Sequence, residues 1–380
     1  MHKPVKLNMR RWAQLALTMG LTLLLLAALL WGSGGASPAR ADPGTLYVRA
    51  ATGDDTGDCR DPATPCQTIG YAISQAVDGD TILIAGGQYT ENLFIGAGLT
   101  LRGAFAVAGT QWTPDGVETT IDGSGQQAPV ITIADLGDQT VTLESLTITG
   151  GEGECSGGVC GGNSPLVIRN CTIRDNTATG GGGALARGNP TTIEDSYILN
   201  NHLQSDLGPG NTGGAGGLRT GEGPLYVINT LLVGNTGDAA IHVNNDLTLM
   251  NVTLADNVGD IIFNPAPAGT LAVTNSIVYG NTNQHLGDCP SGSECITYSD
   301  VEGWTGGGTG NIDANPRFVD AGSGDYHLQF GSPCRDKGTP SGAPTYDIEG
   351  TTRDAAPDMG AYEWTGFRIF LPGILRSFGS

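Results

Sequence analysis

An eleven-residue segment occurs six times in the middle of the chain, and this repeat constrains the fold more than any other feature. The copies read VTLESLTITGG, LVIRNCTIRDN, TTIEDSYILNN, LYVINTLLVGN, LTLMNVTLADN and LAVTNSIVYGN, and they begin at Val141, Leu166, Thr191, Leu225, Leu247 and Leu271. Their starts lie 25, 25, 34, 22 and 24 residues apart, a period that is typical of solenoid proteins. A solenoid presents long side surfaces, so the repeat predicts an architecture and leaves the function to be found on those surfaces.

Branched aliphatic residues occupy the third and eighth positions of every copy and alternate with polar neighbours, which is the pattern of strands with one buried face. They are Leu143, Ile168, Ile193, Val227, Leu249 and Val273 at the third position, and Ile148, Ile173, Ile198, Leu232, Leu254 and Val278 at the eighth. The fifth position holds Ser, Asn or Asp, which tolerate the left-handed backbone of a sharp turn. The eleventh position is Asn in five copies. We expect it to form a second such turn, and stacked turn residues to form a polar ladder.

A third short strand begins after the copies, near Ala184, Leu218, Ile241 and Ile262. Three short strands in a coil of this length predict an all-β fold, the right-handed parallel β-helix, whose hand follows from the crossover rule. A leucine-rich repeat has an overlapping period, but its return segment is helical. The returns here, such as TATGGGGALA and GPGNTGGAGG, are too rich in glycine to form a helix.

The first 41 residues have the features of a signal peptide. Four basic residues precede an apolar stretch that runs from about residue 15 to residue 31, and Ala39, Arg40 and Ala41 form a small-x-small cleavage site. The apolar stretch is also long enough for an uncleaved anchor, but the cleavage site favours removal. We therefore expect export, an extracellular or cell-surface location, and no transmembrane span in the mature chain.

The mature chain is strongly acidic. Removal of residues 1–41 takes away five of the 18 Lys and Arg and none of the 38 Asp and Glu, which leaves a net charge of −25. So acidic a surface repels nucleic acid and anionic lipid, and it repels polyuronates unless a cation bridges them. The expected partner is a polysaccharide or another cell-envelope component, and not nucleic acid; the sequence does not define the oligomeric state.

All eight cysteines follow residue 41, where disulfides are permitted. Three pairs are close in sequence and lie in polar loops, and we expect each pair to be bridged: Cys59 with Cys66, Cys155 with Cys160, and Cys289 with Cys295. Cys171 lies within a repeat and Cys334 lies far downstream. A bridge between these two would require the C-terminal segment to fold back along the coils, and their connectivity stays open.

The segments outside the repeats complete the domain organisation. Thr68 can cap a short helix, TIGYAISQAV, that covers the open end of the core, so residues 42–100 are expected to form an N-terminal cap and the first coils. Residues 101–283 hold the β-helix repeats. An irregular region, residues 284–364, is expected to wrap or cap the C-terminal end. The tail, residues 365–380, combines apolar residues with two arginines and is too short to span a membrane.

Two stretches resemble a known family. The opening, from TLYVRAATGDD to GDTILIAGGQYTENLFI, resembles the N-terminal cap of bacterial exported β-helix proteins of the pectin-lyase-like superfamily. The later motifs NPRF, GDYHL, SPCRDKG and DMGAYE resemble the choice-of-anchor Q domain, although NPRF replaces its usual Asp-Pro start and CR replaces two commonly apolar residues. The resemblance implies a secreted or surface-displayed protein with an interchangeable C-terminal sorting element, here residues 365–380. It implies no single activity.

Related β-helices include polysaccharide lyases and glycoside hydrolases. A lyase needs a base, usually Lys or Arg, and the one mature lysine, Lys337, lies outside the coils. Arg187 and Arg219, which follow third-strand segments, remain as candidates. His242, in AAIHVNND, is expected to point outward and could bind a sugar hydroxyl or act as a base, although an ordinary surface histidine has the same pattern. A hydrolase needs two carboxylates within about 5–10 Å. Asp238 and Asp260 precede successive third strands and could meet that distance, but loop carboxylates are equally expected in so acidic a protein.

Calcium is the one cofactor with any support in the sequence. The loop GDDTGDCRD crowds four candidate ligands, Asp54, Asp55, Asp58 and Asp61, and calcium prefers such oxygen ligands. The spacing departs from that of an EF-hand. Gly-rich stretches join strands instead of opening helices, so no phosphate-binding loop is indicated.

The sequence therefore predicts an exported β-helix protein whose favoured role is the non-catalytic binding of glycan or cell-envelope material. Two alternatives stay open: a divergent polysaccharide lyase or glycoside hydrolase, and a structural adhesin or stalk. The aliphatic and Asn positions of the repeat are explained by core and turns. Recognition is therefore expected on the third-strand face and the returns between copies.

Overall fold

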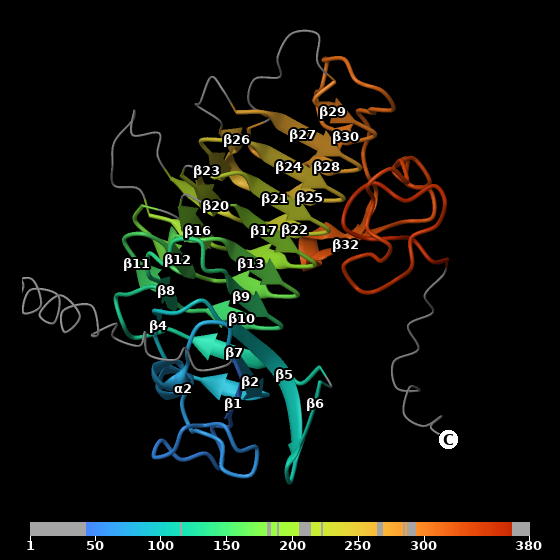
Figure 1. The fold of residues 1–380 in the computed structure, drawn as a ribbon. Helices are drawn as coiled ribbons and strands as arrows, with labels where there is room; N and C mark the ends of the chain where they lie inside the picture. The colour runs from blue at the N-terminus through green and yellow to red at the C-terminus, as the bar shows by residue number, and fades with distance from the viewer. Residues whose placement is uncertain are drawn as a thin grey trace, which may run out of the picture. The chain divides into compact units, whose positions relative to one another are not determined.

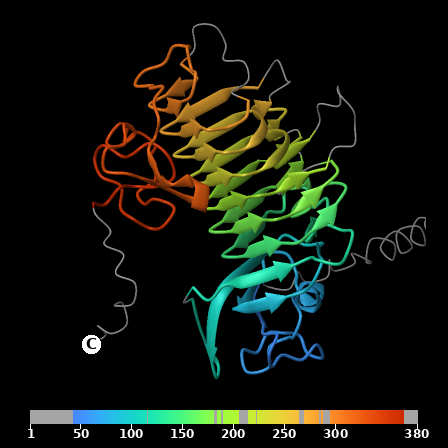
Figure 2. The ribbon, with the colours of Figure 1, turned by 180° about the vertical axis from the view of Figure 1, so that it is seen from behind.

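The computed structural model describes residues 43–114, 116–180, 184–187, 190–204, 214–221, 223–263, 269–283, 286 and 294–366. The predicted signal peptide and all but the first two residues of the predicted tail lie outside them. Three parallel sheets, stacked coil upon coil, form the right-handed parallel β-helix that the repeat predicted (Figures 1 and 2). Among the described residues, no helix is long and apolar enough to cross a membrane.

Each coil contributes strands to sheets A, B and C in turn. Sheet A contains β1 (Thr45–Val48), β2 (Thr81–Ala85), β5 (Thr100–Ala108), β9 (Val141–Glu144), β13 (Leu166–Arg169), β17 (Thr191–Glu194), β21 (Leu225–Ile228), β24 (Leu247–Met250), β27 (Leu271–Thr274) and β29 (Ile296–Thr297), with β6 (Gln111–Pro114) antiparallel to β5. Sheet B contains β3 (Gly87–Tyr89), β7 (Thr119–Asp122), β10 (Thr147–Thr149), β14 (Thr172–Arg174), β18 (Tyr197–Leu199), β22 (Leu231–Val233), β25 (Thr253–Ala255), β28 (Ile277–Tyr279) and β30 (Asp300–Val301).

Sheet C is built from two sets of strands. The longer set contains β4 (Leu93–Ile95), β8 (Ile131–Ile133), β12 (Val159–Asn163), β16 (Ala184–Arg187), β20 (Ala215–Thr220), β23 (Thr236–Val243) and β26 (Val258–Phe263). The second set contains the two-residue strands β11 (Glu152–Gly153), β15 (Thr177–Ala178) and β19 (His202–Leu203), which follow sheet B directly. β23 pairs with strands of both sets.

The aliphatic positions of the repeat form the core between the sheets. All twelve residues predicted at the third and eighth positions are at most 1% exposed. Neighbouring coils pair in register, so that Ile168 lies between Leu143 and Ile193 and equivalent side chains stack in columns. Burial of each such side chain stabilises the fold by about 1.5–3 kcal/mol.

The turn between sheets A and B has the predicted left-handed residue. The fifth-position residues have φ between 50° and 57° in all six copies. At the second turn, between sheets B and C, the prediction is wrong by one residue. The tenth position is left-handed there, as at Asp175 and Asn200, while the eleventh position, as at Asn176 and Asn201, is not.

The eleventh-position asparagines form a buried ladder along the corner between sheets B and C. Each Nδ2 group donates at 3.0 Å to Oδ1 of the asparagine one coil further on, in the order Asn176, Asn201, Asn235, Asn257 and Asn281. Each Nδ2 also donates to a backbone carbonyl oxygen of the preceding coil, such as that of Ile198 for Asn235. A side-chain amide can donate and accept hydrogen bonds at once, so the buried asparagine side chains of the ladder have hydrogen-bond partners inside the core.

The predicted N-terminal helix is confirmed. α2 (Ile69–Gln75) begins after Thr68, whose hydroxyl accepts a hydrogen bond from the Tyr71 backbone amide at 3.2 Å. Glu91 accepts from the first two backbone amides of the helix. Since Ile69, Ala72 and Ile73 are buried in the main core cluster, the helix covers apolar residues of the first coils.

The first part of the C-terminal region continues the coils and covers the end of the core, where Ile296 and Val301 belong to the main cluster and Trp304 packs against it, and the later part packs beside the coils. β29 and β30 first extend sheets A and B beyond residue 283. β31 (Phe318–Asp320), the 3₁₀ helix η1 (Ala321–Ser323) and β32 (Asp325–Leu328) follow, and Tyr326 and Tyr362 pack against Leu231 and Val233 of sheet B (Figure 1, orange and red). β22 reads Leu-Leu-Val, so its outward side chains are also apolar and require a cover.

The disulfide predictions are confirmed for Cys59–Cys66 and Cys155–Cys160. Cys295 is also disulfide-bonded, and its predicted partner, Cys289, lies outside the described residues. Cys171 and Cys334 are free, buried thiols. The bridge between them that the sequence left open is therefore not present.

Candidate functional site

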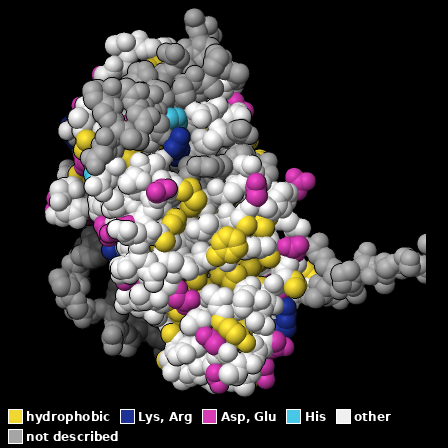
Figure 3. Space-filling view, turned by 90° about the vertical axis from the view of Figure 1, so that its left-hand side faces the viewer, with side chains coloured by type: hydrophobic (Ala, Val, Ile, Leu, Met, Phe, Trp, Pro, Cys, Tyr) yellow, Lys and Arg dark blue, Asp and Glu magenta, His cyan; other side chains and the backbone are white. Residues whose placement is uncertain are grey.

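Sheet C carries the residues that the sequence singled out, and Figure 3 looks onto the side of the coil stack where this sheet lies. β20 and β23 pair in parallel with Arg219 in register beside His242. Leu185 of β16 and Phe263 of β26 occupy the same register position on the flanking coils. The structure thus brings Arg219 and His242 together on adjacent coils.

His242 is 4% exposed, so the expectation of an exposed surface histidine is wrong. The residue alternates with the core residues Ile241 and Val243, yet its own side chain is covered. Its Nε2 lies 3.2 Å from Oδ1 of Asn244. Burial and the Arg219 guanidinium lower the pKa of His242, so the imidazole is neutral at neutral pH and can accept a proton.

The two candidate carboxylates lie on neighbouring coils, as predicted. Asp260 of β26 pairs in register with Ala239 of β23, the residue after Asp238. Asp260 also accepts a hydrogen bond from Nδ2 of Asn283 at 3.2 Å. Asp238 precedes His242 by four positions on β23, which corresponds to about 13 Å along the strand. The negative charge of Asp238 nevertheless acts on His242 and raises its pKa, against the larger effects of burial and Arg219.

Arg219 is held by the coil on its other side. Its Nη1 donates a hydrogen bond to the backbone carbonyl of Gly180. The guanidinium is therefore partly neutralised by a backbone dipole and fixed next to the imidazole. A cation and a neutral base side by side are two of the groups that a polysaccharide lyase requires.

A polar groove of about 380 Å³ lies over the two-residue strands of sheet C. Its polar lining consists of Gln127, Glu152, Glu154, Thr177, Thr179 and Gln204. Glu152 and Thr177 are in register on adjacent coils, and His202 continues the row. Carboxylates, hydroxyls and amides are groups that hydrogen-bond to sugar hydroxyls. These residues belong to no sequence motif, so only the general expectation of recognition between the repeat copies pointed to this groove.

In the predicted calcium loop, the carboxylates of Asp55, Asp58 and Asp61 accept hydrogen bonds in turns and a cap. Asp55 accepts hydrogen bonds from the backbone amides of Gln67 and Thr68 and from the Thr68 hydroxyl. Asp58 and Asp61 accept from backbone amides two residues on, and Asp54 donates its amide to the carbonyl of Pro65. Within the described ranges, no group of three or more His, Cys, Asp or Glu residues converges as a metal site would require.

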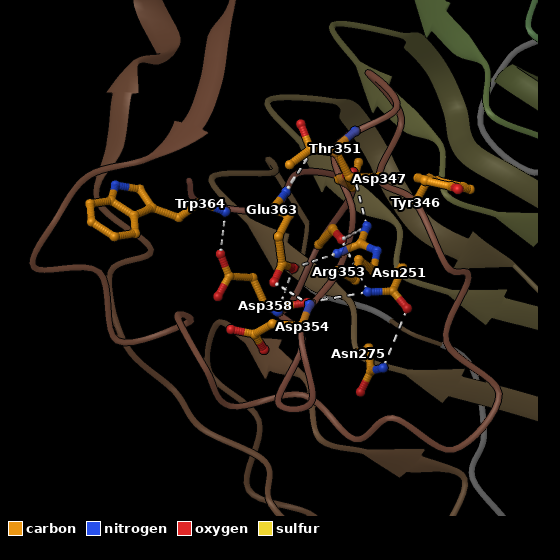
Figure 4. Close-up of polar contacts among 12 residues, drawn as sticks. Asn251, Asn275, Tyr346, Asp347, Thr351, Arg353, Asp354, Asp358, Glu363 and Trp364 are labelled. Carbon is orange, nitrogen blue, oxygen red and sulfur yellow. Dashed lines mark hydrogen bonds and ion pairs between the residues drawn. The ribbon is translucent and has the colours of Figure 1, made fainter. Parts of the chain in front are cut away.

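A buried polar network joins the C-terminal region to the turns of the coils (Figure 4). Arg353 is 7% exposed and donates to Oδ1 of Asn229 at 2.8 Å, to the Ala361 carbonyl at 3.0 Å and to Oε2 of Glu363 at 3.2 Å. Asp358 accepts from the backbone amide of Trp364 at 2.6 Å. This network fixes the C-terminal region on the coil stack and was not predicted from the sequence.

Two buried carboxyl groups under this region are expected to make stability depend on pH. Burial raises the pKa of Asp300 to about 6 and that of Asp358 to about 7. The folded protein then holds these protons more tightly than the unfolded chain, in which Asp titrates near pH 4. The free energy of unfolding should therefore rise as the pH falls from about 7 to about 4.

Urea unfolding at about pH 8 and about pH 5 measures this rise. The net negative charge acts in the same direction, so a variant is needed to isolate one group. Asp300→Asn keeps the shape of the side chain and can still accept the hydrogen bond from the Ala314 amide. The rise should be smaller in this variant than in the wild type, and an equal rise in both would contradict the role given to Asp300.

Comparisons with known proteins gave similarity at the level of structure. No family model matches the chain, and no curated protein matches it. A crystal structure of pectate lyase Pel9A is similar with a TM-score of 0.40 and 13% identity, over 85% of this chain and 98% of the lyase. A pectin methylesterase from Aspergillus niger is similar with a TM-score of 0.27 and 16% identity, over 69% of this chain and 91% of the esterase. The strand order and register define the class of this protein as a parallel β-helix protein.

Proposed function

We propose that the protein acts outside the cell and binds a polysaccharide chain along sheet C without cleaving it. The observation that carries this proposal is the groove over β11 and β15, where Glu152 and Thr177 stand in register on adjacent coils. Strands of neighbouring coils lie about 4.8 Å apart. The groove therefore repeats hydrogen-bonding groups along the stack, as a linear polysaccharide repeats its hydroxyl groups.

Several features support an extracellular location of the protein. The disulfides Cys59–Cys66 and Cys155–Cys160 form in oxidising compartments. The predicted signal peptide and the resemblance of residues 311–364 to the choice-of-anchor Q domain support export with display at the cell surface. On this proposal, residues 365–380 act as the sorting signal.

The positions of the perturbed carboxyl groups support binding without hydrolysis. Burial raises the pKa of Asp195, Asp300, Asp358 and Glu363. Each of these accepts hydrogen bonds at the contact between the C-terminal region and the coils, or in the turn below it. A general acid with a raised pKa would have to face the bound sugar. None of these four lines the groove on sheet C, whereas Glu363 lines a separate pocket in the C-terminal region.

A second candidate, a polysaccharide lyase, is favoured by the Arg219–His242 pair. A neutral imidazole could remove the proton next to a uronate carboxylate, while the neighbouring guanidinium offsets the negative charge that develops. His242 is 4% exposed, so the imidazole would first have to become accessible to the substrate. The acidic surface opposes binding of such a substrate unless calcium bridges the two. The same experiment can therefore decide between binding and cleavage.

The test is calorimetric titration of the purified mature protein with neutral, amino-substituted and uronate oligosaccharides, with and without calcium. We expect binding of at least one oligosaccharide and no new reducing or unsaturated ends. Glu152→Ala should weaken that binding by about tenfold or more, since hydrogen bonds to charged groups contribute about 1.5–3 kcal/mol.

The matched control is Glu118→Ala, which removes an exposed glutamate outside the groove and should bind as the wild type does. Turnover that is lost in Arg219→Ala and kept in Arg174→Ala would replace the proposal by the lyase. If no oligosaccharide bound, the proposal would fail and a structural adhesin or stalk would be favoured.

A further inference from the structure

A second pocket, remote from sheet C in the sequence and in the sheet order, lies in the C-terminal region. It has a volume of about 320 Å³ and is lined by Asp325, His327, Phe330, Glu349 and Trp364, among others. Most of its lining is apolar, with a few polar groups that converge on it. This composition is typical of ligand pockets, and nothing in the proposed function of sheet C accounts for it.

Two aromatic rings form one wall of the pocket. Phe330 is 64% exposed, and its ring centroid lies 5.8 Å from that of Trp364 at an interplanar angle of 57°. The Arg335 guanidinium lies 3.5 Å from the centroid of the Trp364 ring and 5.4 Å from that of the Phe330 ring, so it holds the indole in place and covers one face of each ring. Leaving an aromatic side chain this exposed costs hydrophobic free energy, and a ligand that stacks on it would recover that free energy.

Two carboxylates face this wall and are positioned by one imidazole. Nδ1 of His327 lies 2.7 Å from Oδ1 of Asp325, and Nε2 lies 3.2 Å from Oε2 of Glu349. The imidazole itself rests against Tyr362, with ring centroids 4.0 Å apart. A protonated imidazole donates to both carboxylates, whereas a neutral one has a single N–H and holds only one of them. A carboxylate that is held before the ligand arrives lowers the entropy cost of binding.

The charge of the pocket selects the class of ligand. Asp325 and Glu349 carry two negative charges, so the three groups remain net negative whether His327 is neutral or protonated. Because Arg335 already lies over the rings, the attraction for a cationic ligand comes from Asp325 and Glu349, whose carboxylates accept hydrogen bonds from ammonium and hydroxyl groups. A uronate would be repelled by the same carboxylates.

We propose that this pocket binds an amino sugar, a pyranose ring that carries a protonated amine. The apolar face of the ring would stack on Phe330 and Trp364, and the amine and hydroxyl groups would donate to Asp325 and Glu349. The site is independent of the groove on sheet C, so the protein would hold a glycan at two places with different chemistry.

The test is calorimetric titration of the mature protein with an oligosaccharide of glucosamine and with its fully N-acetylated, uncharged counterpart. The charged oligosaccharide should bind at least tenfold more tightly, and added salt should weaken its binding. Asp325→Asn and Phe330→Ala should each lower this affinity by about tenfold or more.

Two controls separate this site from the groove on sheet C. Phe94→Ala removes an equally exposed phenylalanine, 63% exposed, from β4, and Glu152→Ala alters the groove; neither should change tight binding of the glucosamine oligosaccharide. Equal affinity for the acetylated and charged forms would overturn the proposal, as would wild-type affinity in Phe330→Ala. Loss of binding in Glu152→Ala alone would assign the amino sugar to sheet C.

Discussion

Replacement of Arg353 by methionine is expected to lower the free energy of unfolding by about 3–5 kcal/mol, because it leaves a buried carboxylate without its cation. Glu363 is 5% exposed and would keep its position next to an apolar side chain. Asn229 and the carbonyl of Ala361 would also lose a donor. Urea unfolding monitored by circular dichroism measures the difference, and its midpoint should fall without a change in secondary structure.

An exposed arginine provides the control for this prediction. Arg174 pairs with Asp175 on the surface of sheet B, where both side chains are more than 40% exposed, and surface pairs contribute about 0–1 kcal/mol. Arg174→Met should therefore change stability little. The double variant Arg353→Met, Glu363→Gln should recover part of the loss, since no buried charge is left unpaired. A loss as small as that of Arg174→Met would contradict the role of Arg353 in holding the C-terminal region.

Replacement of Asn235 by alanine is expected to destabilise the coils by about 3–5 kcal/mol, since several buried polar groups lose their partners at once. Oδ1 of Asn235 accepts from the backbone amide and from Nδ2 of Asn201. Its Nδ2 donates to the carbonyl of Ile198 and to Asn257. All of these groups are buried, so water cannot replace the lost hydrogen bonds.

Asn283→Ala serves as the comparison, because Asn283 is exposed and donates one hydrogen bond to Asp260. The free energy of unfolding of Asn283→Ala should lie within about 0.5 kcal/mol of that of the wild type. Thermal unfolding of the three proteins under identical conditions measures both values. A similar small effect at both positions would mean that the ladder contributes little to the stability of the stack.

The coils could be predicted from the sequence because each constraint acts on a single residue. The residue equivalent to Ile168 has to be buried in every copy of the repeat, and the residue equivalent to Asn170 has to adopt a left-handed backbone conformation. An aliphatic residue and a turn-forming residue therefore recur at fixed positions. The second turn was assigned one residue too late, since Asp175 and Asn176 both favour turns. The structure separates them by chemistry: a carboxylate can only accept hydrogen bonds, whereas the amide of Asn176 can donate to the next coil and continue the ladder.

The site could be predicted only in part. The register of the repeats placed Arg219 and His242 on adjacent coils, but the burial of His242 depends on side chains that no repeat position specifies. The docking of the C-terminal region depends on contacts such as Arg353 with Asn229, which are 124 residues apart. Pairs so distant leave no periodic pattern in a single sequence, and the pocket beside Trp364 is a product of that docking.

The unequal length of the coils has a consequence for how such a protein can diversify. Successive repeats start 25, 25, 34, 22 and 24 residues apart, while the unit that forms sheets A and B keeps eleven residues. All insertions and deletions therefore fall between the eleventh-position asparagine and the next strand of sheet A, on the side of sheet C. Lengthening a flexible loop costs little, about 0.6 kcal/mol for each doubling. Within these six coils, the flank of sheet C can therefore acquire new recognition loops by mutation while the unit of sheets A and B keeps its length.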